Sequence, residues 1–97
     1  MLQPWSLFIL RNESAEPMRL TLFVSGRTVW YGDLRSGGAQ AALSIVDRDT
    51  GIRVTCAKPG SAPLTTEGGY LTHSLPHITT IQMQSCALPG YEIEGLP

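Results

Sequence analysis

The sequence predicts an all-β protein: a single small antiparallel β-sandwich or barrel of about six to eight short strands linked by hairpins, with little or no helix. Residues 18–31 alternate apolar and polar side chains around a central glycine, which is the pattern of a β-hairpin. Similar short segments follow along the chain, separated by many of its 10 glycines and 7 prolines. Charged residues make up 15% of the chain, against about 25% in typical domains, which disfavours long solvated helices.

The length allows one hydrophobic core, so we expect residues 1–97 to form one domain. The first strand is expected from residue 5 to about residue 11. Its apolar run, residues 5–10, is much shorter than the roughly 20 residues of a membrane-spanning helix. The run also meets Arg11 rather than the small residues of a signal-peptide cleavage site. We therefore expect a cytoplasmic protein without a transmembrane segment.

The hairpin is expected to pair residues 18–24 with residues 28–31. Gly26 suits the first central position of a type II′ turn, which favours a Gly26–Arg27 loop over a Ser25–Gly26 loop. Either loop leaves the alternation of side chains unchanged. One face is then core, comprising Leu20, Leu22, Val24, Val29 and Tyr31. The other face carries Thr21, Phe23, Thr28 and Trp30.

The remaining elements follow from the same alternation. Residues 39–47 and 52–57 are expected to form a second hairpin, and residues 58–69 the longest loop. A short strand is expected at residues 70–73 and a longer one at residues 77–86. The tail, residues 87–97, alternates again after a Pro–Gly turn. It is expected to be either a last edge strand or an extended arm that docks on a neighbouring subunit.

Cys56 and Cys86 have two alternative states. A disulfide between them would close a loop of about thirty residues and add roughly 3–4 kcal/mol to stability. In a cytoplasmic protein the same residues stay reduced and act as small core side chains. No other feature of the sequence indicates an oxidising compartment, so we favour the reduced state.

The triplet formed by Asp49, Thr50 and Gly51 is similar to the active-site triplet of the retroviral-type aspartic proteases. Those enzymes are homodimers of all-β chains in which the two aspartates share one proton. The resemblance therefore implies a hydrolase built on Asp49. It covers three residues, and Arg48 before the triplet and Ile52 after it depart from the family pattern.

Other chemistry is poorly represented in the sequence. His73 and His77, together with the two cysteines, are residue types that bind zinc, but no two cysteines are closely spaced as in zinc-binding motifs. The chain contains neither a nucleophile elbow nor a phosphate-binding loop. The net charge is −1 and the arginines are scattered, which disfavours nucleic acid as a partner. We expect no metal and no cofactor.

The resulting expectation is a non-enzymatic binding or interaction module that self-associates or docks a protein partner through a sheet face or edge. The predicted contact residues are Phe23 and Trp30, with Arg19 nearby, or alternatively Tyr91 and Ile93 in the tail. One alternative is the aspartic-protease-like hydrolase. Another is a peripheral lipid- or sugar-binding sandwich that uses exposed aromatic side chains.

Overall fold

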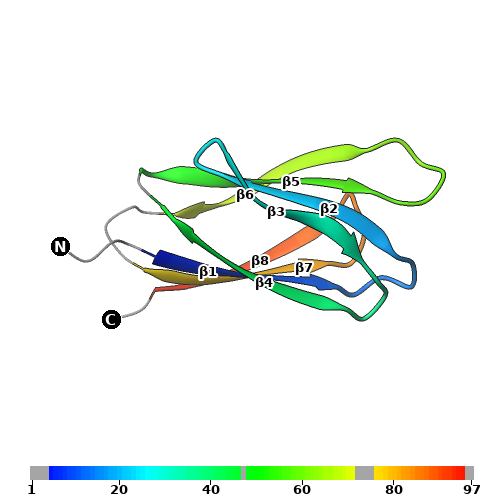
Figure 1. The fold of residues 1–97 in the computed structure, drawn as a ribbon, viewed down its shortest axis with the longest axis horizontal. Helices are drawn as coiled ribbons and strands as arrows, with labels where there is room; N and C mark the ends of the chain where they lie inside the picture. The colour runs from blue at the N-terminus through cyan, green and yellow to red at the C-terminus, as the bar shows by residue number, and fades with distance from the viewer. Residues whose placement is uncertain (1–4, 47, 72–75, 96–97) are drawn as a thin grey trace.

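The computed structural model describes residues 5–46, 48–71 and 76–95, which contain eight strands and no helix. Two sheets pack face to face as the layers of a sandwich (Figure 1), and they do not close into a barrel. This confirms the predicted all-β class. The strands are β1 (Trp5–Asn12), β2 (Met18–Val24), β3 (Arg27–Leu34), β4 (Ala39–Ile45), β5 (Thr50–Ala57), β6 (Leu64–Leu71), β7 (His77–Met83) and β8 (Pro89–Gly95).

One sheet has the strand order β4-β1-β7-β8 and the other has the order β3-β2-β5-β6. All neighbouring strands are antiparallel except β1 and β7, which run parallel. Strand β3 contacts β4 across the sandwich on one side, and β6 contacts β8 on the other. In the first sheet, the strand order makes β4 and β8 the two edge strands.

The core lies between the sheets and follows the period-two alternation of the strands. Strand β2 buries Leu20, Leu22 and Val24, as the sequence predicts. Strand β5 contributes further residues from the same sheet, and β1 and β7 supply the facing layer. The principal members are Phe8, Leu10, Leu20, Leu22, Val24, Ile52, Val54, Ile81 and Met83.

The turn and register of the β2–β3 hairpin differ from the expectation. Ser25 and Gly26 form the turn, and their φ angles of 54° and 75° are both positive. Two positive φ angles are typical of a type I′ turn, so the predicted Gly26–Arg27 type II′ loop is wrong. Leu22 pairs with Trp30 while Phe23 pairs with Thr28, which leaves Val29 as the extra residue of a β-bulge.

This bulge overturns the predicted division of β3 into two faces. Trp30 lies opposite the core residue Leu22 and packs against the core, whereas Tyr31 is 73% exposed. Phe23 and Trp30 therefore do not share an outer face, and Tyr31 is not a core residue. The physical reason is that one inserted residue reverses the alternation of every side chain beyond it.

The expected second hairpin is also wrong. Strand β4 pairs with β1, while β5 pairs with β2 and β6. Strand β6 lies largely within the segment expected to be the longest loop. Alternation indicates that a segment is extended but does not identify the strand with which it pairs. The adjacent glycines Gly68 and Gly69 are typical of a turn, so the sequence did not reveal that β6 continues through them. Residues 72 and 73 of the predicted short strand lie outside the described residues.

Cys56 and Cys86 form a disulfide, with their Cα atoms 5.3 Å apart. This corrects the preference for reduced thiols. Cys56 belongs to β5, and Cys86 follows β7 in the opposite sheet, so the bond joins the two layers. The strand expected at residues 77–86 ends earlier, at Met83, and the chain then turns Cys86 toward the core.

The tail forms the edge strand β8 through residue 95, so its described part is not an arm. Tyr91 and Ile93, the predicted docking residues of the tail, are partly buried and pack against the core. Gly68 accounts for the position of Tyr91, because a Cβ atom at Gly68 would overlap Cε2 of the tyrosine ring. Burial raises the pKa of the Tyr91 hydroxyl.

Candidate interaction surface

Strand β1 is apolar on both of its sides. Phe8 and Leu10 point into the core, while Trp5, Leu7 and Ile9 alternate with them and point outward. A strand that borders water normally carries polar residues on its outer side. Apolar residues on both sides are typical of a strand that is covered on both faces.

Neighbouring strands extend the outer side of β1 into a continuous surface. Leu7 lies between Leu43 of β4 and Ile78 of β7, and Trp5 lies opposite Ile45 of β4. We call this surface the apolar face, defined by six residues: Trp5, Leu7, Ile9, Leu43, Ile45 and Ile78. Trp5 is 51% exposed and Leu43 is 63% exposed. The other four are partly exposed.

Charged residues border the apolar face on two sides. Arg11 follows Ile9 along β1 and is exposed. Glu92 and Glu94 of β8 lie opposite Thr80 and Ile78 of β7. The third side is the free edge of β4, which carries no charged residue. Within residues 5–46, 48–71 and 76–95, no strand or helix covers this face.

The outer face of the other sheet is polar by contrast. Arg19 Nε donates to Asp33 at 2.9 Å, and Arg53 Nη2 donates to Glu67 at 2.7 Å. The hydroxyl oxygens of Thr55 and Thr65 lie 2.9 Å apart across β5 and β6. Cross-strand ion pairs and threonine pairs suit a sheet face in water. The sandwich therefore has one hydrated outer face and one apolar outer face.

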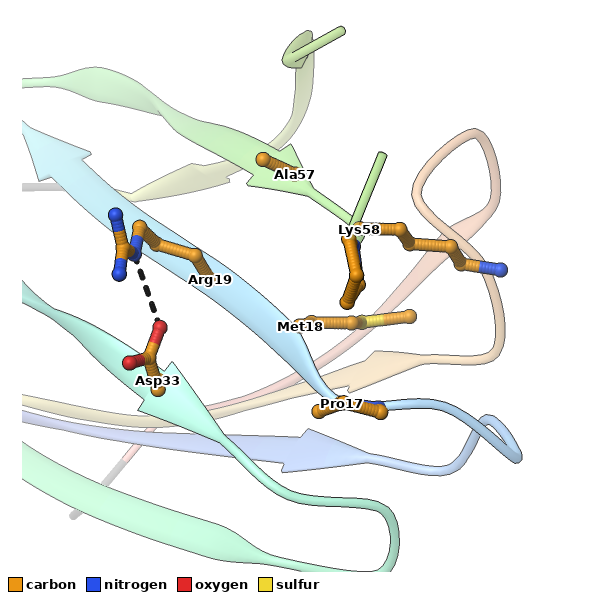
Figure 2. A pocket seen from close by; sticks show the side chains of 7 residues that line it. Pro17, Met18, Arg19, Asp33, Ala57 and Lys58 are labelled. Atoms are coloured by element: carbon orange, nitrogen blue, oxygen red, sulfur yellow. Dashed lines mark hydrogen bonds and ion pairs between the residues drawn. The ribbon is translucent and has the colours of Figure 1, made fainter. Parts of the chain in front are cut away.

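Arg19, a predicted contact residue, lies on the hydrated face beside a shallow pocket of about 470 Å³ (Figure 2). Its guanidinium points toward Asp33, and both side chains are largely exposed. The hydrogen bond from Arg19, reinforced by its positive charge, holds the pKa of the Asp33 carboxyl below its usual value. The guanidinium of Arg19 therefore has its charged partner, Asp33, within the same sheet.

Phe23 also lies on the hydrated face, where it is partly exposed between Thr28 and Arg53. Its predicted partner Trp30 lies over Gly32, where an added Cβ atom would come within 2.9 Å of Cζ2 of the indole ring. The aromatic pair on which the lipid-binding and sugar-binding alternatives relied is therefore absent from this face.

Asp49 of the protease-like triplet lies in the turn between β4 and β5 and is exposed. Its carboxylate accepts a hydrogen bond of 3.1 Å from the hydroxyl of Tyr70, which raises the pKa of that hydroxyl. Thr50 and Gly51 begin β5.

The described part of the chain contains no group of three or more residues placed to bind a metal ion. Cys56 and Cys86 are bonded to each other, which removes the two thiolates from the zinc-binding set considered above. His77 is buried at the start of β7, and His73 lies outside the described residues.

Sequence reasoning missed the apolar face, although a signal for it was present. Residues 5–10 are mostly apolar in succession, rather than alternating as residues 18–24 do. That difference distinguishes a strand with two apolar sides from a strand with one. The contributions of Leu43 and Ile78 had no comparable signal, because they depend on which strands become neighbours of β1.

Comparison with models of known protein families finds no match, and comparison with curated proteins finds no significant relative. No helix in the described residues could cross a bilayer.

Proposed function

We propose that this protein is a non-enzymatic interaction module that associates with a second copy of itself and buries part of its apolar face. The observation that carries the proposal is the difference between the two outer faces of the sandwich. One face is occupied by ion pairs and threonines, while the other presents six apolar side chains with no covering element among the described residues.

The energetics favour association over persistent exposure. Monomeric soluble proteins rarely expose contiguous apolar patches beyond a few hundred Å². Complete burial of one large aliphatic side chain contributes roughly 1.5–3 kcal/mol, and association costs about 4–15 kcal/mol in lost freedom. Several side chains must therefore be buried together, and the apolar face offers a contiguous group. A net charge of −1 produces little repulsion between copies.

The test compares the oligomeric state of the wild type with that of Leu43→Lys over a range of concentrations. We expect sedimentation equilibrium to show a concentration-dependent dimer for the wild type. In Leu43→Lys we expect the dissociation constant to rise at least tenfold, because a buried Leu becomes a charge that must be desolvated. Leu43 is already 63% exposed, so the fold should tolerate the change.

Tyr31→Lys is the matched control. Tyr31 is 73% exposed and lies on the outer side of the other sheet, so this substitution adds the same charge elsewhere. We expect it to leave the dissociation constant unchanged. A wild type that stays monomeric at every concentration would overturn the proposal. Equal weakening by Leu43→Lys and Tyr31→Lys would also overturn it, because the effect would then come from charge alone.

A further inference from the structure

We infer that two copies join edge to edge through β4, antiparallel about Ala42, so that their four-stranded sheets merge into one eight-stranded sheet. The inference rests on the proposed self-association and specifies its geometry. An edge strand leaves a row of backbone N–H and C=O groups without ladder partners, and a second strand can satisfy them.

Strand β4 lacks the features that usually protect an edge. Native sheets block edge-to-edge pairing with charges, prolines, bulges or irregular backbone. Strand β8 begins with Pro89 and carries two glutamates, and β3 contains a bulge together with charged residues. Strand β6 carries Glu67 and has a register shift near Gly69. Strand β4 reads A-Q-A-A-L-S-I, with no charge, no proline and no glycine.

The sequence of β4 is also self-complementary about its central residue. In an antiparallel pair centred on Ala42, Gln40 faces Ser44 of the second copy, and Ala41 faces Leu43 of the second copy. The outermost pair is Ala39 with Ile45. Every polar residue therefore meets a polar residue, and every apolar residue meets an apolar one.

The distribution of the β4 side chains over the two sides of the sheet is consistent with this pairing. Ala41 and Leu43 lie opposite Ile9 and Leu7, which places them on the side of the apolar face. Gln40 and Ser44 lie opposite Leu10 and Ser6, on the inner side. Pairing two β4 strands would place the apolar faces of both copies side by side and bury only their β4 members, so the backbone ladder between the strands supplies the rest of the affinity. The pairing would bury the most exposed member of the face, Leu43, against Ala41 of the second copy.

A charge-complementation experiment tests this register. Ala41→Lys introduces an ammonium opposite Leu43 of the second copy, and Leu43→Glu introduces a carboxylate opposite Ala41. Each variant alone should form a dimer at least tenfold weaker than the wild type. When the two variants are mixed, the new charges face each other across the interface. We expect a one-to-one heterodimer at least tenfold tighter than either variant homodimer, measured at low ionic strength to limit screening.

Two further variants serve as controls. Ile45→Glu replaces Leu43→Glu in the mixture, and it should give much weaker rescue because Ile45 faces Ala39 in the inferred register. Ile78→Lys changes the apolar face on β7, two strands away from the edge, and places its charge opposite Glu94. It should leave the dimer intact. Near-ultraviolet circular dichroism on each variant verifies the fold.

The outcomes separate this inference from the proposed function. Rescue by Leu43→Glu but not by Ile45→Glu, with an intact Ile78→Lys dimer, supports the β4 edge. Loss of dimer in Ile78→Lys, or absence of rescue in the Ala41→Lys and Leu43→Glu mixture, overturns edge pairing and leaves self-association through the face. A monomeric wild type overturns both.

Discussion

Arg19 illustrates how a residue with a plausible binding role can be committed to a contact within its own sheet. Its side chain spans from β2 to Asp33 on β3, where the register places the two residues directly opposite each other. Because the pair is exposed to water, screening keeps its effect on stability small. Its measurable signature is instead the lowered pKa of Asp33.

We predict that the carboxyl of Asp33 titrates below the ordinary aspartate value of 3.8 in the folded protein. The hydrogen bond and positive charge from Arg19 stabilise the ionised form. The contribution to stability is present above pH 3.8 and is lost as the pH falls through the lower folded-state pKa. Carbon-13 NMR of the side-chain carboxyl measures this titration. Arg19→Gln should return the pKa to the ordinary range, and an unchanged value in that variant would contradict the assignment.

At the scale of the element, the bulge in β3 decides the role of Trp30. The extra residue, Val29, turns the indole ring toward the core and leaves the following residue, Tyr31, in water. The large aromatic expected to bind a partner therefore contributes to packing. A bulge of this kind depends on the fit of β3 to its neighbours, so the sequence of the strand alone does not reveal it.

We predict that Trp30→Ala lowers the free energy of unfolding by about 2–3 kcal/mol, somewhat less than the 3–5 kcal/mol typical of fully buried tryptophan. Trp30 is only partly buried, which accounts for the smaller loss. Urea unfolding measures the change, and sedimentation should show an unaltered oligomeric state. Tyr31→Ala is the neighbouring control and should stay within about 0.5 kcal/mol of the wild type. A stable Trp30→Ala protein with weakened self-association would instead support Trp30 as a contact residue.

At the scale of the whole molecule, a disulfide fastens the two layers together. It joins residues separated by 30 positions, one in β5 and one beyond β7. Closing a loop of that length restricts the unfolded chain, which gives a stabilisation of roughly 3–4 kcal/mol.

We predict that the double variant Cys56→Ala and Cys86→Ala loses about this amount of stability in urea unfolding. Treatment of the wild type with a thiol reductant should lower its unfolding midpoint to a similar degree and leave the variant unaffected. A wild type whose midpoint does not respond to complete reduction, verified by thiol titration, would contradict this prediction.

The apolar face is also a property of the whole molecule. One sheet of the sandwich is covered on one side and hydrated on the other, as most antiparallel sheets are. The other sheet has apolar residues on both sides, so it resembles the inner layer of a larger assembly. The inferred edge pairing would cover Leu43 and the free edge of β4, while the outer sides of β1 and β7 would stay exposed.

The sequence by itself determined that this chain is all-β, where most strands lie, and that Leu20, Leu22 and Val24 face the core. These conclusions depend on period-two alternation, which is local to one strand. The tertiary structure alone decided that β1 lies between β4 and β7, which places Leu7, Leu43 and Ile78 in one row. It also decided the bulge at Val29 and the cysteine bond. Alternation assigns side chains to the two sides of a strand, but strand pairing and layer stacking decide which side meets water.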